Sequence, residues 1–166
     1  MSTRYALGPP GMVNEIAARL VAAQVAIVAG AILALGLPGL LALLVWDFGA
    51  RVSGAATLSP FAQLAARVLL PALGRPFRPT PSAPKRFAQA IGLLVSASAL
   101  ALWLVWAQAG VGRALLGLLL LFATLEATLG FCVGCWLFGR LMRWGFLPAS
   151  VCEACAVAER PTAGLR

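Results

Sequence analysis

Residues 16–37 read IAARLVAAQVAIVAGAILALGL, an apolar stretch that carries only Arg19 and Gln24 as strongly polar residues. A helix needs about 20 predominantly apolar residues to cross the hydrocarbon core of a bilayer. The stretch therefore predicts a membrane-spanning helix. It also sets the class of protein that we expect, an all-α integral membrane protein.

Three further apolar stretches follow, at about residues 38–52, 87–108 and 111–138. The last two are long enough to span, whereas the first of them is short and contains Asp47, so that it fits a membrane only with local thinning. Residues 60–73 place apolar side chains at helical spacing over too short a length to cross, which predicts one interfacial amphipathic helix. Residues 74–86 are rich in proline and predict an extended linker. Together these stretches predict four transmembrane helices in a single membrane domain, residues 1–166.

The composition supports the same class. The chain of 166 residues is 61% hydrophobic and 11% charged, against about 25% charged residues in an ordinary soluble domain. A soluble fold of this size has too little interior to hide so much apolar surface, whereas lipid solvates it. The lipid bilayer is therefore the first partner that the sequence predicts.

The basic residues predict an orientation. Of the 13 Lys and Arg residues, only Arg113 lies in one of the two short loops that join the first to the second span and the third to the fourth. The others lie before or at the start of the first span, between the second and third spans, and after the fourth span. Under the positive-inside rule both termini are cytoplasmic, and residues 139–166 form a cytoplasmic tail of a multi-pass protein in a bacterial inner membrane. The basic residues lie in gaps between apolar runs, which argues against nucleic acid as a partner.

The four cysteines form two C-x2-C pairs, Cys132 with Cys135 and Cys152 with Cys155. This spacing is in the range of four-cysteine zinc sites. A reducing cytoplasm disfavours a permanent disulfide. Three interpretations remain beside simple burial of small apolar residues: a metal site, reversible dithiol chemistry, or a sulfur (persulfide) relay.

The first pair should lie at the end of the fourth helix, on one face and just inside the membrane boundary. Arg140 and Arg143 follow it and mark the cytoplasmic interface. These cations would lower the pKa of a nearby thiol, whereas burial among apolar groups would raise it. The sequence leaves the balance between the two open.

Three further polar residues fall inside the expected spans: Asp47, Gln89 and Glu126. On a continuous helix Glu126 precedes Cys132 by about 600° of rotation and so lies roughly opposite to it. A carboxylate in a bilayer is costly unless it is paired, protonated or hydrated. Two interpretations stay open, a proton route or polar pocket beside a quinone, and plain interhelical hydrogen bonding.

Two motifs resemble a known family. Pro84-Lys85-Arg86-Phe87-Ala88-Gln89-Ala90-Ile91-Gly92 and Gly130-Phe131-Cys132-Val133-Gly134-Cys135 are similar to segments of the bacterial integral-membrane family called domain of unknown function 4395. The resemblance covers residues 11–155. It implies no established activity. The second cysteine pair is typical of an actinobacterial-type subgroup, and other members lack it. The resemblance also implies that thioredoxin-like or sulfurtransferase proteins are encoded near some members, which favours thiol or sulfur chemistry.

Three functions follow as hypotheses, of which the third, a transporter or channel, has the least support because the chain shows no internal repeat and few polar residues within the expected spans. The first is a membrane thiol-redox or sulfur-relay protein that uses all four cysteines at the cytoplasmic membrane face, with a thioredoxin-like or sulfurtransferase partner. The alternative is a non-enzymatic scaffold or accessory subunit whose four thiolates bind zinc. Whether the protein is an enzyme, and which cofactor other than zinc it would use, stay open at the level of the sequence.

Overall fold

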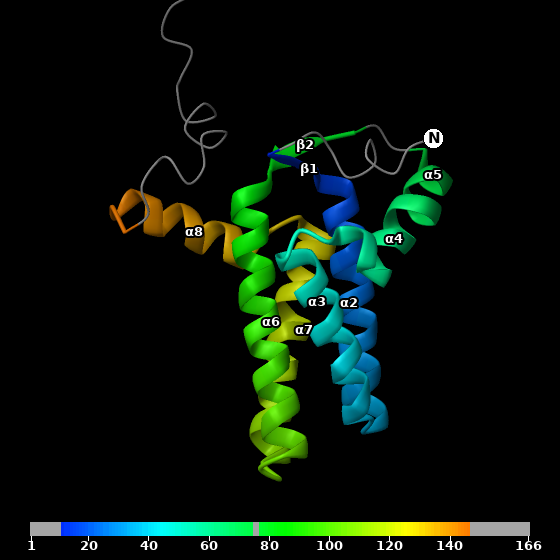
Figure 1. The fold of residues 1–166 in the computed structure, drawn as a ribbon, viewed down its shortest axis with the longest axis vertical. Helices are drawn as coiled ribbons and strands as arrows, with labels where there is room; N and C mark the ends of the chain where they lie inside the picture. Colours follow the sequence, from blue (N-terminus) through cyan, green and yellow to red (C-terminus); the bar gives the residue numbers. More distant parts are fainter. Residues whose placement is uncertain (1–10, 75–76, 147–166) are drawn as a thin grey trace, which may run out of the picture.

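The structure is a computed structural model that describes residues 11–74 and 77–146 (Figure 1). Three helices in it are long and apolar enough to cross a membrane: α2 (Glu15–Leu35), α6 (Ser82–Leu104) and α7 (Ala109–Leu129). They run along the long axis of the molecule, and α7 packs against both α2 and α6. The protein is therefore mainly helical, with three helices of spanning length and composition.

Helix α2 begins and ends at recognisable caps. The Asn14 side chain accepts a hydrogen bond from the Ile16 N–H over 3.1 Å at its start, as an N-cap residue does. Gly36 ends the helix in the left-handed conformation, with φ of 66°, which glycine adopts without a Cβ clash.

The second apolar stretch does not form a helix of spanning length. It folds as a 3₁₀ turn, η1 (Pro38–Leu40), followed by α3 (Leu41–Val52) of 12 residues. Twelve residues of helix cover about 18 Å, well short of a hydrocarbon core of about 30 Å. Helix α3 packs against α6, where the Phe48 ring occupies the space that a Cβ at Gly92 would need.

Residues 60–73 are helical in three consecutive pieces: α4 (Pro60–Leu64), a π-helical turn η3 (Ala65–Leu69) and α5 (Leu70–Leu73). A 3₁₀ turn, η2 (Ala56–Leu58), precedes them. Ser59 caps α4, because its Oγ accepts a hydrogen bond from the Ala62 N–H over 3.1 Å.

Two short strands, which the sequence did not predict, tie the bundle together at one end. Strand β1 (Met12–Asn14) pairs antiparallel with β2 (Pro79–Pro81), with Val13 opposite Thr80. The residues after β2 belong to α6, which begins at Ser82 and not at Phe87. Pro84 is tolerated there because the N–H groups of a first helical turn have no partner within the helix.

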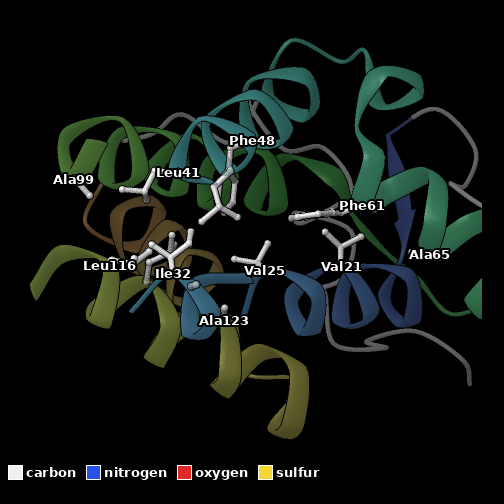
Figure 2. Packing of buried hydrophobic residues seen from close by; sticks show 13 residues of the cluster. Val21, Val25, Ile32, Leu41, Phe48, Phe61, Ala65, Ala99, Leu116 and Ala123 are labelled. Atoms are coloured by element: carbon white, nitrogen blue, oxygen red, sulfur yellow. The ribbon is translucent and has the colours of Figure 1, made fainter. Parts of the chain in front are cut away.

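The core lies between α2, α3, α6 and α7 (Figure 2). Ile32, Leu41 and Leu116 are fully buried within it. Small residues bring the helices close: a Cβ on Gly112 of α7 would lie 3.0 Å from the Ala99 carbonyl oxygen of α6. Such close backbone approach is typical of helix packing in membranes.

The last helix, α8 (Val133–Arg143), leaves the bundle sideways, at the end where β1 and β2 lie (Figure 1). It packs against α6. The first cysteine pair lies where α8 begins.

Candidate functional site

The fourth apolar stretch is broken in the middle. Helix α7 ends at Leu129, and Gly130 caps it with φ of 70°, its N–H bonded to the Glu126 carbonyl over 3.0 Å. Arg19 of α2 holds the end of the helix, donating to the Ala127 carbonyl over 3.2 Å and to the Thr128 carbonyl over 2.6 Å. The prediction of one helix over 111–138 is therefore wrong. Apolar residues continue on both sides of the break, so hydropathy does not detect it.

The first cysteine pair occupies the N-terminus of α8 and not the end of the preceding helix. Cys132 is the N-cap residue, and its Sγ accepts a hydrogen bond from the Cys135 N–H over 3.4 Å. The Cys135 thiol donates to the same sulfur, with the two sulfur atoms 2.7 Å apart. A disulfide needs a separation of about 2.05 Å. The pair is therefore placed to form a disulfide with little movement.

The surroundings shift the pKa values of the two thiols in opposite directions. The hydrogen bond from the Cys135 thiol lowers the pKa of Cys132, and the Lys85 ammonium and the Cys135 N–H act in the same direction, against burial and the Glu126 carboxylate. That same hydrogen bond raises the pKa of Cys135, and burial raises it further. A thiolate at a helix N-terminus is also favoured by the helix dipole. Cys132 is therefore the more acidic thiol of the pair, and Cys135 the less acidic one.

Lys85 is a cation beside the cysteine pair that the sequence analysis did not single out as a candidate site residue. It lies in the first turn of α6, is buried, and donates to Glu126 Oε1 of α7 over 2.5 Å. Lys85, and neither Arg140 nor Arg143, is the cation among the main causes that lower the pKa of Cys132. Lys85 directly precedes the Arg-Phe-Ala-Gln motif, and this position could have marked it as a candidate. The sequence analysis used its charge only to predict the orientation in the membrane.

Glu126 also lies on the cysteine side of the bundle. The prediction that Glu126 lies opposite Cys132 is wrong. It assumed one continuous helix through both residues, whereas α7 ends at Leu129. Glu126 and Cys132 line one and the same cavity, together with Lys85 and Gln89.

The two family-like motifs pack against one another. A Cβ on Gly134 would lie 2.6 Å from the Cβ of Ala88, so only glycine lets the first turn of α8 rest on α6 at this point. One turn further on, the rings of Phe87 and Phe138 are 5.5 Å apart between centroids. The Arg-Phe-Ala-Gln segment of α6 is thus the surface against which the C-x2-C segment of α8 packs.

Asp47 lies in a separate polar cluster. Its Oδ1 accepts from Ser59 Oγ over 2.5 Å and from the Phe61 N–H over 3.1 Å. Its Oδ2 lies 2.5 Å from Arg51 Nη2. With both oxygens engaged, Asp47 fixes α3 to the start of α4 and has no free oxygen to offer a ligand.

Cys152 and Cys155 lie outside the described residues. Within residues 11–74 and 77–146, no group of three or more Cys, His, Asp or Glu side chains is arranged to hold a metal ion. The zinc hypothesis needs the second pair, and the described part of the chain does not test it.

Two cavities meet at the cysteine pair. One, here called the bundle cavity, has a volume of about 510 Å³ and lies between α2, α3, α6 and α7. The other, here called the junction cavity, has a volume of about 410 Å³ and is lined by Thr80, Phe131 and Trp136 among others. Cys132 and Lys85 line both cavities, and Cys135 lines the junction cavity.

The fold and the site define a helical protein with three helices long and apolar enough to cross a membrane and a C-x2-C dithiol at the N-terminus of the lateral helix α8. The chain belongs to the family described as Domain of unknown function (DUF4395), whose sequence profile matches residues 13–143. The match confirms the family resemblance. No curated protein and no solved structure matches the chain.

Proposed function

We propose that this protein is a membrane thiol oxidoreductase in which Cys132 and Cys135 cycle between dithiol and disulfide. The observation that carries the proposal is the pair itself, two sulfur atoms 2.7 Å apart at a helix N-terminus beside a buried lysine. Cys132 attacks as the thiolate, and Cys135 resolves the mixed disulfide. A persulfide on Cys132 would use the same nucleophile, so sulfur relay is a variant of this proposal.

The partner that we propose is a cytoplasmic thioredoxin-like or sulfurtransferase protein. Its dithiol would reduce the Cys132–Cys135 disulfide through the junction cavity, which Cys135 lines. Each exchange forms one sulfur–sulfur bond and breaks another, so that the partner is oxidised as this protein is reduced. Cys152 and Cys155 are proposed as a second pair that exchanges with the first or with the partner.

The location that we propose is a bacterial inner membrane, with four crossings and both termini cytoplasmic. Pairing of β1 with β2 places the starts of α2 and α6 at one face, so the chain between them must return to it. Helix α3 and the residues up to Ser59 would make that return. Maleimide labelling of intact cells that express a variant with all four native cysteines replaced by serine tests this: Gly39→Cys should react from outside, and Thr80→Cys only after permeabilisation. Equal labelling of both would refute four crossings.

The redox proposal is tested on the full chain in detergent, in a Cys152→Ser/Cys155→Ser background. Equilibration with reduced and oxidised dithiothreitol should remove two thiols together at one midpoint. Cys135→Ser should trap a stable mixed disulfide with a small aromatic disulfide, and Cys132→Ser should react much more slowly. Independent titration of the two thiols would overturn the proposal.

The alternative is the zinc-binding scaffold. It predicts about one zinc per chain in the unsubstituted protein, with metal lost on replacement of any one of the four cysteines. Such a result, together with thiols that react only after chelation, would replace the redox proposal.

A further inference from the structure

The bundle cavity is elongated along the bundle. Its lining runs from Ala17 to Val25 on α2 and from Ser82 to Val95 on α6, which corresponds to roughly 12–20 Å of helix. Its volume of about 510 Å³ falls within the range of roughly 300–1,000 Å³ that small-molecule sites occupy.

The two ends of the cavity differ in chemistry. Its polar lining residues come from helix ends on the side of the cysteine pair: the start of α6 supplies Lys85 and Gln89, the end of α7 supplies Glu126, and Cys132 is the N-cap of α8. The other polar residues of the lining also lie at helix ends: Asn14, Arg51, Ser82 and Arg86. Deeper in the bundle the lining is apolar, with Val25, Val95 and Leu119. A ligand that fits has a polar, thiol-reactive head and an apolar tail.

Hydrogen-bond donors remain for such a head. Lys85 carries three N–H donors, and among the described residues its ammonium is bonded to one oxygen of Glu126. The amide of Gln89 supplies a second donor on the same wall. Both would suit carbonyl oxygens, which accept hydrogen bonds and become negative when the ring that bears them is reduced.

We infer that the bundle cavity binds a lipid-soluble quinone, with its ring against Cys132 and its isoprenoid tail along the apolar end. The inference rests on the proposed dithiol function and names its electron acceptor. A quinone combines the two carbonyls, the apolar tail and the capacity for two electrons that this cavity and this dithiol require together. It reaches the site through the bilayer, while partner thiols reach Cys135 through the junction cavity.

The electrons and atoms balance. The Cys132 thiolate adds to a ring carbon and forms a carbon–sulfur bond. The Cys135 thiol loses its proton and attacks Cys132 Sγ, so that the sulfur–sulfur bond forms and the carbon–sulfur bond breaks. The bonding electron pair stays on the ring. The two thiol protons end on the two ring oxygens, and dithiol plus quinone become disulfide plus hydroquinone, with the Lys85 ammonium beside the developing oxyanion.

The test uses the full chain, reduced, in detergent without oxygen, in the Cys152→Ser/Cys155→Ser background. The probe is a benzoquinone with a single isoprene unit, followed by its absorbance together with the thiol count. We expect saturable kinetics and one quinone consumed per two thiols. Cys135→Ser should accumulate the quinone adduct on Cys132. Non-saturable kinetics equal to those of a free thiol in the same detergent would overturn the inference.

A cavity-filling variant separates binding from thiol reactivity. Ala22 lines the cavity and is buried, so Ala22→Phe should raise the KM for the quinone at least tenfold while exchange with a small aromatic disulfide stays unchanged. Ala34→Phe, on the same helix but exposed, is the matched control and should alter neither. Val95→Phe fills the cavity from α6 and serves if Ala22→Phe does not fold.

The outcomes keep the two proposals apart. If the pair does not cycle with a small disulfide, the proposed function fails. If it cycles but Ala22→Phe and Val95→Phe leave quinone kinetics unchanged, the quinone inference alone fails. Mass spectrometry of the purified protein adds a third arm: an ordinary acyl lipid that is retained and not displaced by the quinone would assign the cavity to lipid packing.

Discussion

Two carboxylate–cation pairs occur in the described part of the chain, and each has an oxygen–nitrogen distance of 2.5 Å. Asp47 and Arg51 are four residues apart on one helix, and Asp47 is completely buried. Lys85 and Glu126 come from different helices and lie beside the thiols. Both line the bundle cavity, as Arg51 of the first pair also does. The first pair is closed by further hydrogen bonds to Asp47 and serves packing. The second has one hydrogen bond from the Lys85 ammonium among the described residues and lies beside the cysteine pair.

The largest effect is expected at the closed pair. Asp47→Ala leaves Arg51 buried without its counter-charge and removes the acceptor for Ser59 and the Phe61 N–H. Breaking a buried pair costs about 3–5 kcal/mol. Thermal unfolding in detergent should show this loss, while the alkylation rate of Cys132 in the protein that stays folded should be unchanged. A changed alkylation rate would show that the two pairs are not independent.

The next effect concerns the contact between α8, which carries the cysteine pair, and α6. Gly134→Ala places a Cβ 2.6 Å from the Cβ of Ala88, and such overpacking costs about 1–3 kcal/mol. Gly139→Ala in the same helix meets no atom within 4 Å and should stabilise by up to about 1 kcal/mol through helix propensity. Unfolding midpoints and the rate of disulfide formation are measured together. Equal effects of the two variants would mean that α8 does not rest on α6.

A loss of comparable size is expected at the helix break. Arg19→Gln removes the hydrogen bonds to the Ala127 and Thr128 carbonyls, worth about 1–3 kcal/mol. Limited proteolysis should become faster near Gly130. Arg113→Gln, an exposed cation packed on Trp103 at the other end of the bundle, should leave proteolysis there unchanged.

The smallest expected change is a shift in the pKa of Cys132, and its direction tests the roles of Lys85 and Glu126. Lys85→Met removes a cation that lowers the pKa of Cys132, so the pKa rises and less thiolate is present at neutral pH. Glu126→Gln removes an anion that raises it, so the pKa falls. The midpoint of iodoacetamide alkylation against pH should therefore move upward in the first variant and downward in the second. Shifts of the same sign would refute the assigned roles.

Sequence reasoning succeeded where many residues carry one signal. The apolar stretches of α2, α6 and α7 predicted helices of spanning length because lipid demands about 20 apolar residues in a row. It failed where single residues decide. Gly130 breaks a run that stays apolar on both sides, and only its left-handed conformation ends the helix.

The site shows the same contrast. The C-x2-C spacing predicted that Cys132 and Cys135 belong together, because the spacing is local in the sequence. Lys85 is 41 residues from its partner Glu126, and neither segment by itself contains a pattern that predicts the contact. Such a pair follows from the packing of α6 on α7, which a single sequence does not specify.

Arg19 reaches a carbonyl 108 residues further along the chain. During synthesis helix α2 is therefore complete long before the carbonyls that its guanidinium binds have been made. Until the end of α7 is present, Arg19 lacks these two acceptors, and the break from which α8 starts is not held against α2. The position of the cysteine pair relative to α2 is thus among the last features of the described chain to be set.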